Sequence, residues 1–253
     1  SIHYYPVKSL SFSSLKKAKI KKNLGILNDR LFAFTRNIDY ENASLFEKFP
    51  KNRRLNNFLT LKNSPVLNQY KFTYEGDELT LFKGVTKIIS ISSNDNYNYS
   101  LICKKLIELE PELLKPIFLL KNENYPFFDT THSDQINNTI SLINLNSIKD
   151  LEINIKQTIE FERFRGNLYI DGIDPWHERT WINKIIKINK ISFKIKDHIA
   201  RCSATNLKPN TTNSTINLPL TLKKNFNHSD MGVYITPLED GEISIDDKII
   251  FYK

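Results

Sequence analysis

The chain has 253 residues, of which 40% are hydrophobic and 25% charged, a balance that allows an ordinary globular core. No apolar run approaches the roughly 20 residues that a transmembrane helix needs, and residues 1–10 lack the basic-then-apolar layout of a secretory signal, so we expect no membrane span. The net charge of +8 is compatible with nucleic-acid binding. Because the excess is mostly lysine spread along the chain, we expect no nucleic-acid partner.

The two cysteines, Cys103 and Cys202, are too few for a disulfide framework. They also lack the paired spacing that is typical of zinc sites. Free thiols are the simpler interpretation, and they favour a reducing compartment. The sequence therefore predicts a cytoplasmic protein.

Strand patterns dominate the first part of the chain. KKAKIKK (16–22) alternates lysine with apolar residues as an exposed strand does. LFAFTR (31–36) and TKIISIS (86–92) are rich in β-branched or aromatic residues. Residues 70–83 alternate aromatic and polar positions on both sides of a Gly-Asp pair, which predicts a β-hairpin. Several short strands at this spacing indicate a barrel or a sandwich.

Two helices are expected in the middle of the chain. SLICKKLIELE (100–110) carries its apolar residues on one helical face, which makes Cys103 a predicted core residue. Residues 141–155 begin as a short strand and continue as a helix, for which Asn146 or Ser147 is a suitable N-cap.

The last third returns to strand patterns. Residues 185–197 contain two alternating runs around an Asn-Lys pair and predict a tight hairpin. Residues 207–217 are rich in Thr, Asn and Pro and predict a mobile loop. The final segment (240–253) reads as a turn followed by a strand. The expected fold class is a β-rich mixed α+β protein.

Several common kinds of site are excluded by their missing motifs. The chain has no GxxxxGK[ST] phosphate loop and no GxGxxG dinucleotide turn, and with seven glycines it could hardly build either. Its five histidines show no HExxH or other close ligand spacing, and no GxSxG nucleophile elbow is present.

Arginine is scarce, with eight residues in the chain. Four of them stand in unusual local settings and, with the pair Lys8-Ser9, are candidates for an anion site: Arg30, Arg163, Arg165 and Arg201. Each alone is more typical of a surface ion pair. Together they suggest an anion site, because the guanidinium fork matches phosphate and other oxyanions bidentately.

Cys202 follows Arg201 in the polar run ARCSATN. A neighbouring cation favours the thiolate, which is the form of cysteine that ligates metals or attacks electrophiles. A structural role for this cysteine stays the alternative.

Seven segments, taken in order, carry a family resemblance: YPVKS (5–9), GILNDRLFAFT (25–35), FERFRGNLYIDG (161–172), HERTW (177–181), ARCSATNLKPNT (200–211), LPLTLKK (218–224) and GVYITPLEDGEISIDDKI (232–249). Each is weak alone, but the ordered set resembles the MOSC family, which is named for the C-terminal domain of molybdenum cofactor sulfurase. By layout, the sequence is most similar to amidoxime-reducing proteins. The resemblance implies an N-terminal β-barrel-like domain (1–95) followed by a MOSC β-barrel with a few helices (96–253).

The same resemblance implies a site in the cleft between the two domains. Cys202 corresponds to the residue whose thiolate ligates molybdenum, and soft sulfur ligands suit such a centre. A polar residue near the strand that precedes residues 146–155 also contributes in relatives, and Thr139 is the candidate here. The other positions that correspond to contacts with the pterin and phosphate of the molybdenum cofactor (Mo-molybdopterin) are Lys8, Ser9, Arg30, Arg165, Asn167 and Arg201.

The function implied is reduction of N-hydroxylated small molecules at molybdenum, with electrons from a separate flavin, haem or ferredoxin-type protein. The alternative is a non-catalytic carrier of the molybdenum cofactor or of sulfur. A basic nucleic-acid-associated β protein is the third interpretation. One departure affects the site directly, because Gly166 replaces the proline of the family's FRPN motif, which we expect to loosen that turn.

Overall fold

The structure is a computed structural model in which residues 1–128 and 140–251 are described. Thr139 therefore lies outside the described residues. Four α-helices are seen: α1 (Tyr40–Lys48), α2 (Asn96–Leu109), α3 (Leu145–Ile155) and α4 (Leu218–Phe226). In the part of the chain that is described, no helix is both long enough and apolar enough to cross a bilayer.

The largest sheet has eight strands and joins both ends of the sequence. Its strands, in spatial order, are β16 (Ile249–Phe251), β12 (Ile185–Ile188), β13 (Ile191–Ala200), β14 (Asp230–Pro237), β10 (Ile140–Asn144), β11 (Leu168–Ile170), β1 (Ile2–Tyr4) and β2 (Ser13–Leu15). All neighbours pair antiparallel except β10 and β11, which are parallel. The first strand of the chain is therefore held beside β11, close to the FRGN segment.

Three smaller sheets complete the strand structure. They are β15 (Gly241–Ser244) with β3 (Lys17–Lys21) and β4 (Gly25–Ile26); β5 (Phe32–Phe34) with β9 (Leu119–Lys121); and β6 (Tyr70–Glu75) with β7 (Glu78–Lys83) and β8 (Thr86–Ser92). The β-rich mixed α+β class is thus confirmed. Among the described strands no sheet closes on itself, so the expected barrels take the form of open sheets.

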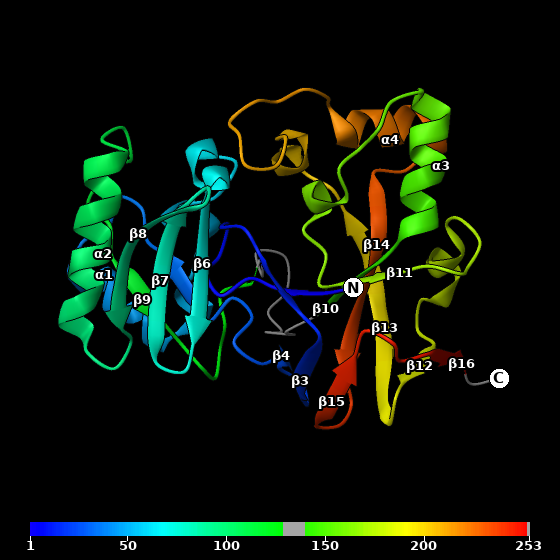
Figure 1. The fold of residues 1–253 in the computed structure, drawn as a ribbon, viewed down its shortest axis with the longest axis horizontal. Coiled ribbons are helices and arrows are strands. Elements are labelled where there is room, and N and C mark those ends of the chain that lie inside the picture. Colours follow the sequence, from blue (N-terminus) through cyan, green and yellow to red (C-terminus); the bar gives the residue numbers. More distant parts are fainter. Residues whose placement is uncertain (129–139, 252–253) are drawn as a thin grey trace.

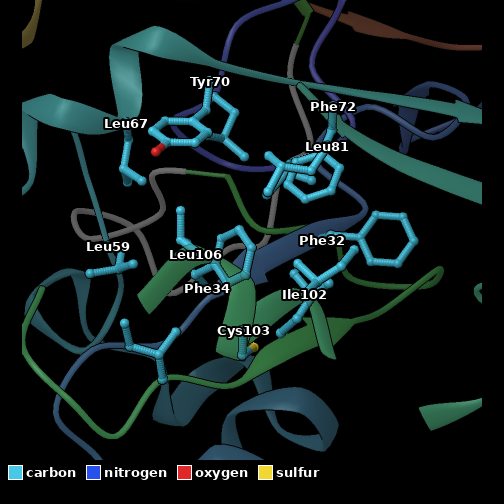
Figure 2. Packing of buried hydrophobic residues seen from close by; sticks show 14 of the residues in the cluster. Phe32, Phe34, Leu59, Leu67, Tyr70, Phe72, Leu81, Ile102, Cys103 and Leu106 are labelled. Carbon is cyan, nitrogen blue, oxygen red and sulfur yellow. The ribbon is translucent and has the colours of Figure 1, made fainter. Parts of the chain in front are cut away.

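Figure 1 shows the molecule as two parts side by side, with α1, α2 and β6–β9 on one side and β10–β16, α3 and α4 on the other. The first part has a core in which α2 packs against β8 and β9. Cys103 lies in that core, as expected, among residues such as Phe34, Ile102 and Leu106 (Figure 2). Burial raises the pKa of the Cys103 thiol to about 12. The domain boundary at residue 95 stays a prediction.

The local patterns of the sequence formed largely as expected. The two predicted hairpins are β6–β7 and β12–β13. In β3 the lysines are exposed while Ala18 and Ile20 are buried. Two details differ: the N-cap of α3 is Asn144, whose side chain accepts a hydrogen bond from the Asn146 N–H, and the final segment contains β15 as well as β16. Asn144 is the N-cap because β10 ends at this residue and α3 begins at the next one.

His3 on β1 provides a test of this arrangement by pH. Its side chain is buried against the rings of Phe12 and Tyr169, with Ser1 and Ser14 hydroxyls near its two ring nitrogens. Burial lowers the pKa of His3 to about 4. In the unfolded chain the pKa of His3 is near its ordinary value of about 6.5. Between this pH and about 4 the unfolded chain binds a proton that the folded chain does not bind, so stability falls as the pH drops through this window.

We expect the His3→Gln variant to lose this part of the pH dependence, which amounts to at most about 3 kcal/mol. The measurement is urea unfolding of wild type and variant at several pH values between 4 and 7. If the two curves fall in parallel over that window, His3 is not the group responsible.

Candidate functional site

The site is organised around Tyr5, which follows β1 and is 1% exposed. The guanidinium carbons of Arg30 and Arg165 each lie 4.6 Å from the centroid of its ring. Both distances fall within the range of cation–π contacts. The charge of Arg201 also acts on the Tyr5 phenol, and it opposes the rise of the Tyr5 pKa to about 12, whose main cause is burial. Two predicted site arginines, remote in sequence, thus contact one buried ring, and Arg201 lies near enough for its charge to act on it.

The backbone at these positions is unusual. Ser9, Arg30 and Arg165 have φ angles of 69°, 54° and 51°. Left-handed backbone is disfavoured for residues other than glycine and asparagine, and it tends to persist where surrounding contacts over-determine it, often at functional sites. Apart from asparagines, the other described non-glycine residues with positive φ are Lys156, at the end of α3, and Trp176. Strained backbone therefore concentrates at the predicted anion site.

Asp29 accepts hydrogen bonds from three segments of this cluster. It is 2% exposed, and one carboxylate oxygen accepts a hydrogen bond from the Tyr5 N–H at 2.7 Å. The other oxygen accepts from the Arg30 guanidinium and, at 3.0 Å, from Asn167 Nδ2. Burial raises the pKa of Asp29, and the Arg30 charge is the largest influence that lowers it. Asp29 thus joins the N-terminal segment, the NDR turn and the FRGN segment.

Arg201 is held by main-chain oxygens. Its Nη1 donates to the Phe164 carbonyl at 2.8 Å, and its Nε and Nη2 donate to the Met231 carbonyl. No carboxylate pairs with it within the described part of the chain. Burial accordingly lowers the pKa of the guanidinium. Because it pairs with no carboxylate, Arg201 contributes a fixed, half-buried positive charge at this site.

Cys202 comes directly after Arg201 and caps the short 3-10 helix η6 (Ser203–Asn206). Its carbonyl accepts from the N–H of Thr205 at 3.0 Å and from its hydroxyl at 2.8 Å. The side chain is half-buried. No hydrogen bond to its sulfur is present among the described residues. The sulfur is therefore neither in the hydrocarbon core, as that of Cys103 is, nor engaged by the protein.

Lys8 and Asn167 have clear partners. Lys8 is buried, and its Nζ lies 3.4 Å from the Phe127 carbonyl, next to the Phe128 ring that Arg30 also faces. Asn167 is 1% exposed: its Nδ2 donates to the His3 carbonyl and to Asp29, and its Oδ1 accepts from the N–H and hydroxyl of Ser141. Asn167 thus fixes the geometry of the site, and its direct contact to a cofactor stays a prediction.

Arg163 does not join the cluster. It is 4% exposed and forms an ion pair with Glu160. It also donates to the Asn206 carbonyl and to the Thr215 hydroxyl, so it anchors the loop that follows Cys202. Sequence reasoning missed Tyr5 and Asp29, although each stands next to or within a motif used above: YPVKS for Tyr5 and NDR for Asp29.

A cavity of about 390 Å³ opens beside the cluster. Its lining includes Tyr5, Arg165 and Lys71 as well as Ala204 and Leu207 from the segment after Cys202. Small-molecule sites have volumes of roughly 300–1,000 Å³ and combine apolar walls with a few polar groups. The cavity therefore has the size and the lining of a small-molecule site with positive charge at its wall.

Gly166 stands between Arg165 and Asn167, and its N–H donates to the Tyr169 hydroxyl at 2.8 Å. A Cβ atom at this position would lie 2.6 Å from Ile143 Cδ1 and 2.9 Å from Tyr169 Cζ. The Tyr169 hydroxyl in turn donates to the Phe161 carbonyl. The turn is thus held tightly, and the expected loosening from the missing proline is not what the contacts show.

We expect Gly166→Pro to destabilise the protein by roughly 2–4 kcal/mol, because the ring overlaps Tyr169 and the donated hydrogen bond is lost. Gly166→Ala keeps the N–H donor, so its loss of stability should come only from the overlap of the added Cβ with Ile143 and Tyr169. Thermal unfolding of the two variants checks this, and a proline variant as stable as the wild type would contradict the close contact.

The fold is β-rich, and the arginine cluster lies beside a cavity of about 390 Å³. Residues 129–250 match the family model of the MOSC domain, so this part of the chain is a MOSC domain, as the sequence resemblance indicated. No curated protein matches the chain.

Two solved structures resemble the chain at low identity. YiiM from Geobacillus stearothermophilus is 13% identical, with a TM-score of 0.37, over 45% of this chain and 54% of that one. The YUAD protein from Bacillus subtilis is 8% identical, with a TM-score of 0.44, over 100% of this chain and 94% of that one. The chain thus spans about half the length of the YiiM structure.

Proposed function

We propose that the protein is a molybdenum-cofactor-dependent reductase that removes oxygen from N-hydroxylated small molecules. The observation that carries this proposal is the contact of Arg30 and Arg165 with the Tyr5 ring, together with Arg201, which adjoins Cys202 and donates to the Phe164 carbonyl, in a chain that contains a MOSC domain. Such a set combines a soft sulfur ligand with positive charge for an anionic group.

The residues present fit such a cofactor chemically. The thiol of Cys202 is half-buried and makes no hydrogen bond in the described structure, so it is available as a ligand. The lining of the neighbouring cavity includes Tyr5, Arg165 and the segment after Cys202. Within the described residues no group of three or more His, Cys, Asp or Glu could hold a metal ion. A centre with one protein ligand is compatible with that.

In this proposal Cys202 supplies the thiolate ligand, and Arg30 and Arg165 hold the phosphate of the cofactor by bidentate contacts. Arg201 places a fixed positive charge beside the ligand. Asp29 and Asn167 fix the relative positions of the turns that carry Arg30 and Arg165. Lys8 and Ser9 complete the N-terminal side. When bound, the cofactor supplies two-electron oxygen-removal chemistry at molybdenum. The partners are a small-molecule substrate and a separate electron-donor protein of the flavin, haem or ferredoxin type, in the cytoplasm.

The test combines metal content and turnover. The protein is purified from a host that makes the molybdenum cofactor, its molybdenum content per chain is measured, and benzamidoxime reduction is followed with a chemical reductant. Molybdenum near one atom per chain together with turnover supports the proposal. Absence of molybdenum overturns it. Molybdenum without turnover favours the carrier alternative instead.

A further inference from the structure

Tyr5 contacts Arg30, Arg165 and Asp29 from one position. The guanidinium carbons of Arg30 and Arg165 each lie 4.6 Å from the centroid of its ring. Its hydroxyl donates to the Gly166 carbonyl at 3.2 Å. Its N–H donates to Asp29, and its carbonyl accepts from the Arg30 N–H at 2.6 Å. Few residues at a site use the ring, the hydroxyl and both main-chain groups in this way.

We propose that Tyr5 is the positioning residue of the anion site, because its ring holds the Arg30 and Arg165 guanidinium groups together for a phosphate-like ligand. This inference rests on the proposed function only in that the ligand there is the phosphate of a cofactor. Tyr5 itself does not contact the reacting atoms in this proposal.

The physical reason lies in the repulsion between like charges. Two guanidinium groups that approach the same point repel each other, and each side chain loses rotamer freedom when it is fixed. The negative face of an aromatic ring attracts both cations and offsets part of this cost. Since the ring is buried and its hydroxyl is tied to the Gly166 carbonyl, it cannot turn away. The two cations are thereby arranged before the ligand arrives.

Three variants separate the ring from the hydroxyl. Tyr5→Leu removes both, and Tyr5→Phe keeps the ring but loses the bond to Gly166. Tyr99→Phe is the matched control, because the Tyr99 hydroxyl is also in a buried environment and donates to a carbonyl, that of Ser93, at 2.8 Å. Tyr99 belongs to the α2 core and does not contact the arginines. The probe is pyrophosphate, titrated by calorimetry at low ionic strength and well below the unfolding temperature of each variant.

We expect Tyr5→Leu to weaken pyrophosphate binding about tenfold, the order that follows from losing two cation–π contacts. Tyr5→Phe should weaken it no more than about threefold, since the ring remains. Tyr99→Phe should lower the unfolding temperature and leave the affinity unchanged. A purely structural role for Tyr5 would lower the stability of Tyr5→Leu and Tyr5→Phe without this order of affinities.

Equal pyrophosphate affinity in wild type and Tyr5→Leu would overturn the proposal. So would a wild-type protein that binds no pyrophosphate. Neither result touches the proposed function, which depends on molybdenum content and benzamidoxime turnover. Conversely, a protein without molybdenum whose pyrophosphate affinity follows the expected order would support the role of Tyr5 while the reductase proposal fails.

Discussion

Replacing Cys202 by serine is expected to leave the fold intact and to abolish benzamidoxime reduction. The side chain is half-buried and its sulfur makes no hydrogen bond within the described structure, so the fold does not depend on it. A hydroxyl is a hard, protonated ligand and a poor replacement for a thiolate at molybdenum. Changes to residues that merely support a metal ligand already cost 10–100-fold. We therefore expect turnover and molybdenum retention to fall by roughly 100-fold or more.

The matched control is Cys103→Ala, which removes the other thiol of the chain. Cys103 lies on α2, in the core of the first part and far in the sequence from every candidate ligand (Figure 2). This variant should lower stability by roughly 1 kcal/mol and retain its molybdenum. The measurements are molybdenum per chain, benzamidoxime turnover and thermal unfolding for all three proteins. A Cys202→Ser variant with wild-type molybdenum and turnover would remove Cys202 from the site.

Much of the fold was predictable because its signals are local. The alternation in residues 70–83 and 185–197, together with short polar turns, determines both hairpins. The apolar face of residues 100–110 determines α2 and the burial of Cys103. What could not be predicted is the pairing of β1 with β11, since these strands lie more than 160 residues apart and pair through only one register contact. The sequence contains no local signal for such a partner.

The site was predictable in part, and for a different reason. The residues alone suggested an anion site at the arginines and a thiolate at Cys202, and the family resemblance assigned them to one cofactor. The structure adds what brings Arg30 and Arg165 together: both guanidinium groups contact the Tyr5 ring, and Asp29 bonds to three segments. Both residues look ordinary in sequence, because a buried tyrosine and an acid beside an arginine are common. Their importance depends on tertiary contacts.

Asn144 shows how a small local error arises. Asn146 and Ser147 are both good N-cap residues, and their positions fit the apolar pattern of the helix. The strand β10 ends at Asn144, however, and its side chain can cap the helix only if the chain turns there. Ser147 is instead used by Glu178, a fully buried acid that also accepts from Asn144. The contact with Glu178, which lies on another segment, therefore determines which of the suitable residues caps α3.

Replacing Asp29 by alanine is expected to cost roughly 3 kcal/mol of stability and to remove pyrophosphate binding. The carboxylate accepts from the Tyr5 N–H, from Asn167 Nδ2 and from the Arg30 guanidinium. Alanine leaves all three donors without this acceptor in a buried place, and each unsatisfied donor costs about 1–3 kcal/mol before the structure relaxes. Arg30 then loses the carboxylate that directs it toward the cluster. Urea unfolding and pyrophosphate titration measure the two effects.

Glu178→Gln is the matched control for Asp29→Ala, because Glu178 is also a buried acid with side-chain donors, Asn144 and Ser147, but belongs to the α3 region. It should change stability without changing pyrophosphate affinity. Asp29→Asn should lie between the wild type and Asp29→Ala, since an amide oxygen can still accept from the Tyr5 N–H but cannot pair with the Arg30 charge. If Asp29→Ala binds pyrophosphate as the wild type does, Arg30 is oriented by other contacts, and the carboxylate serves only to hold the segments together.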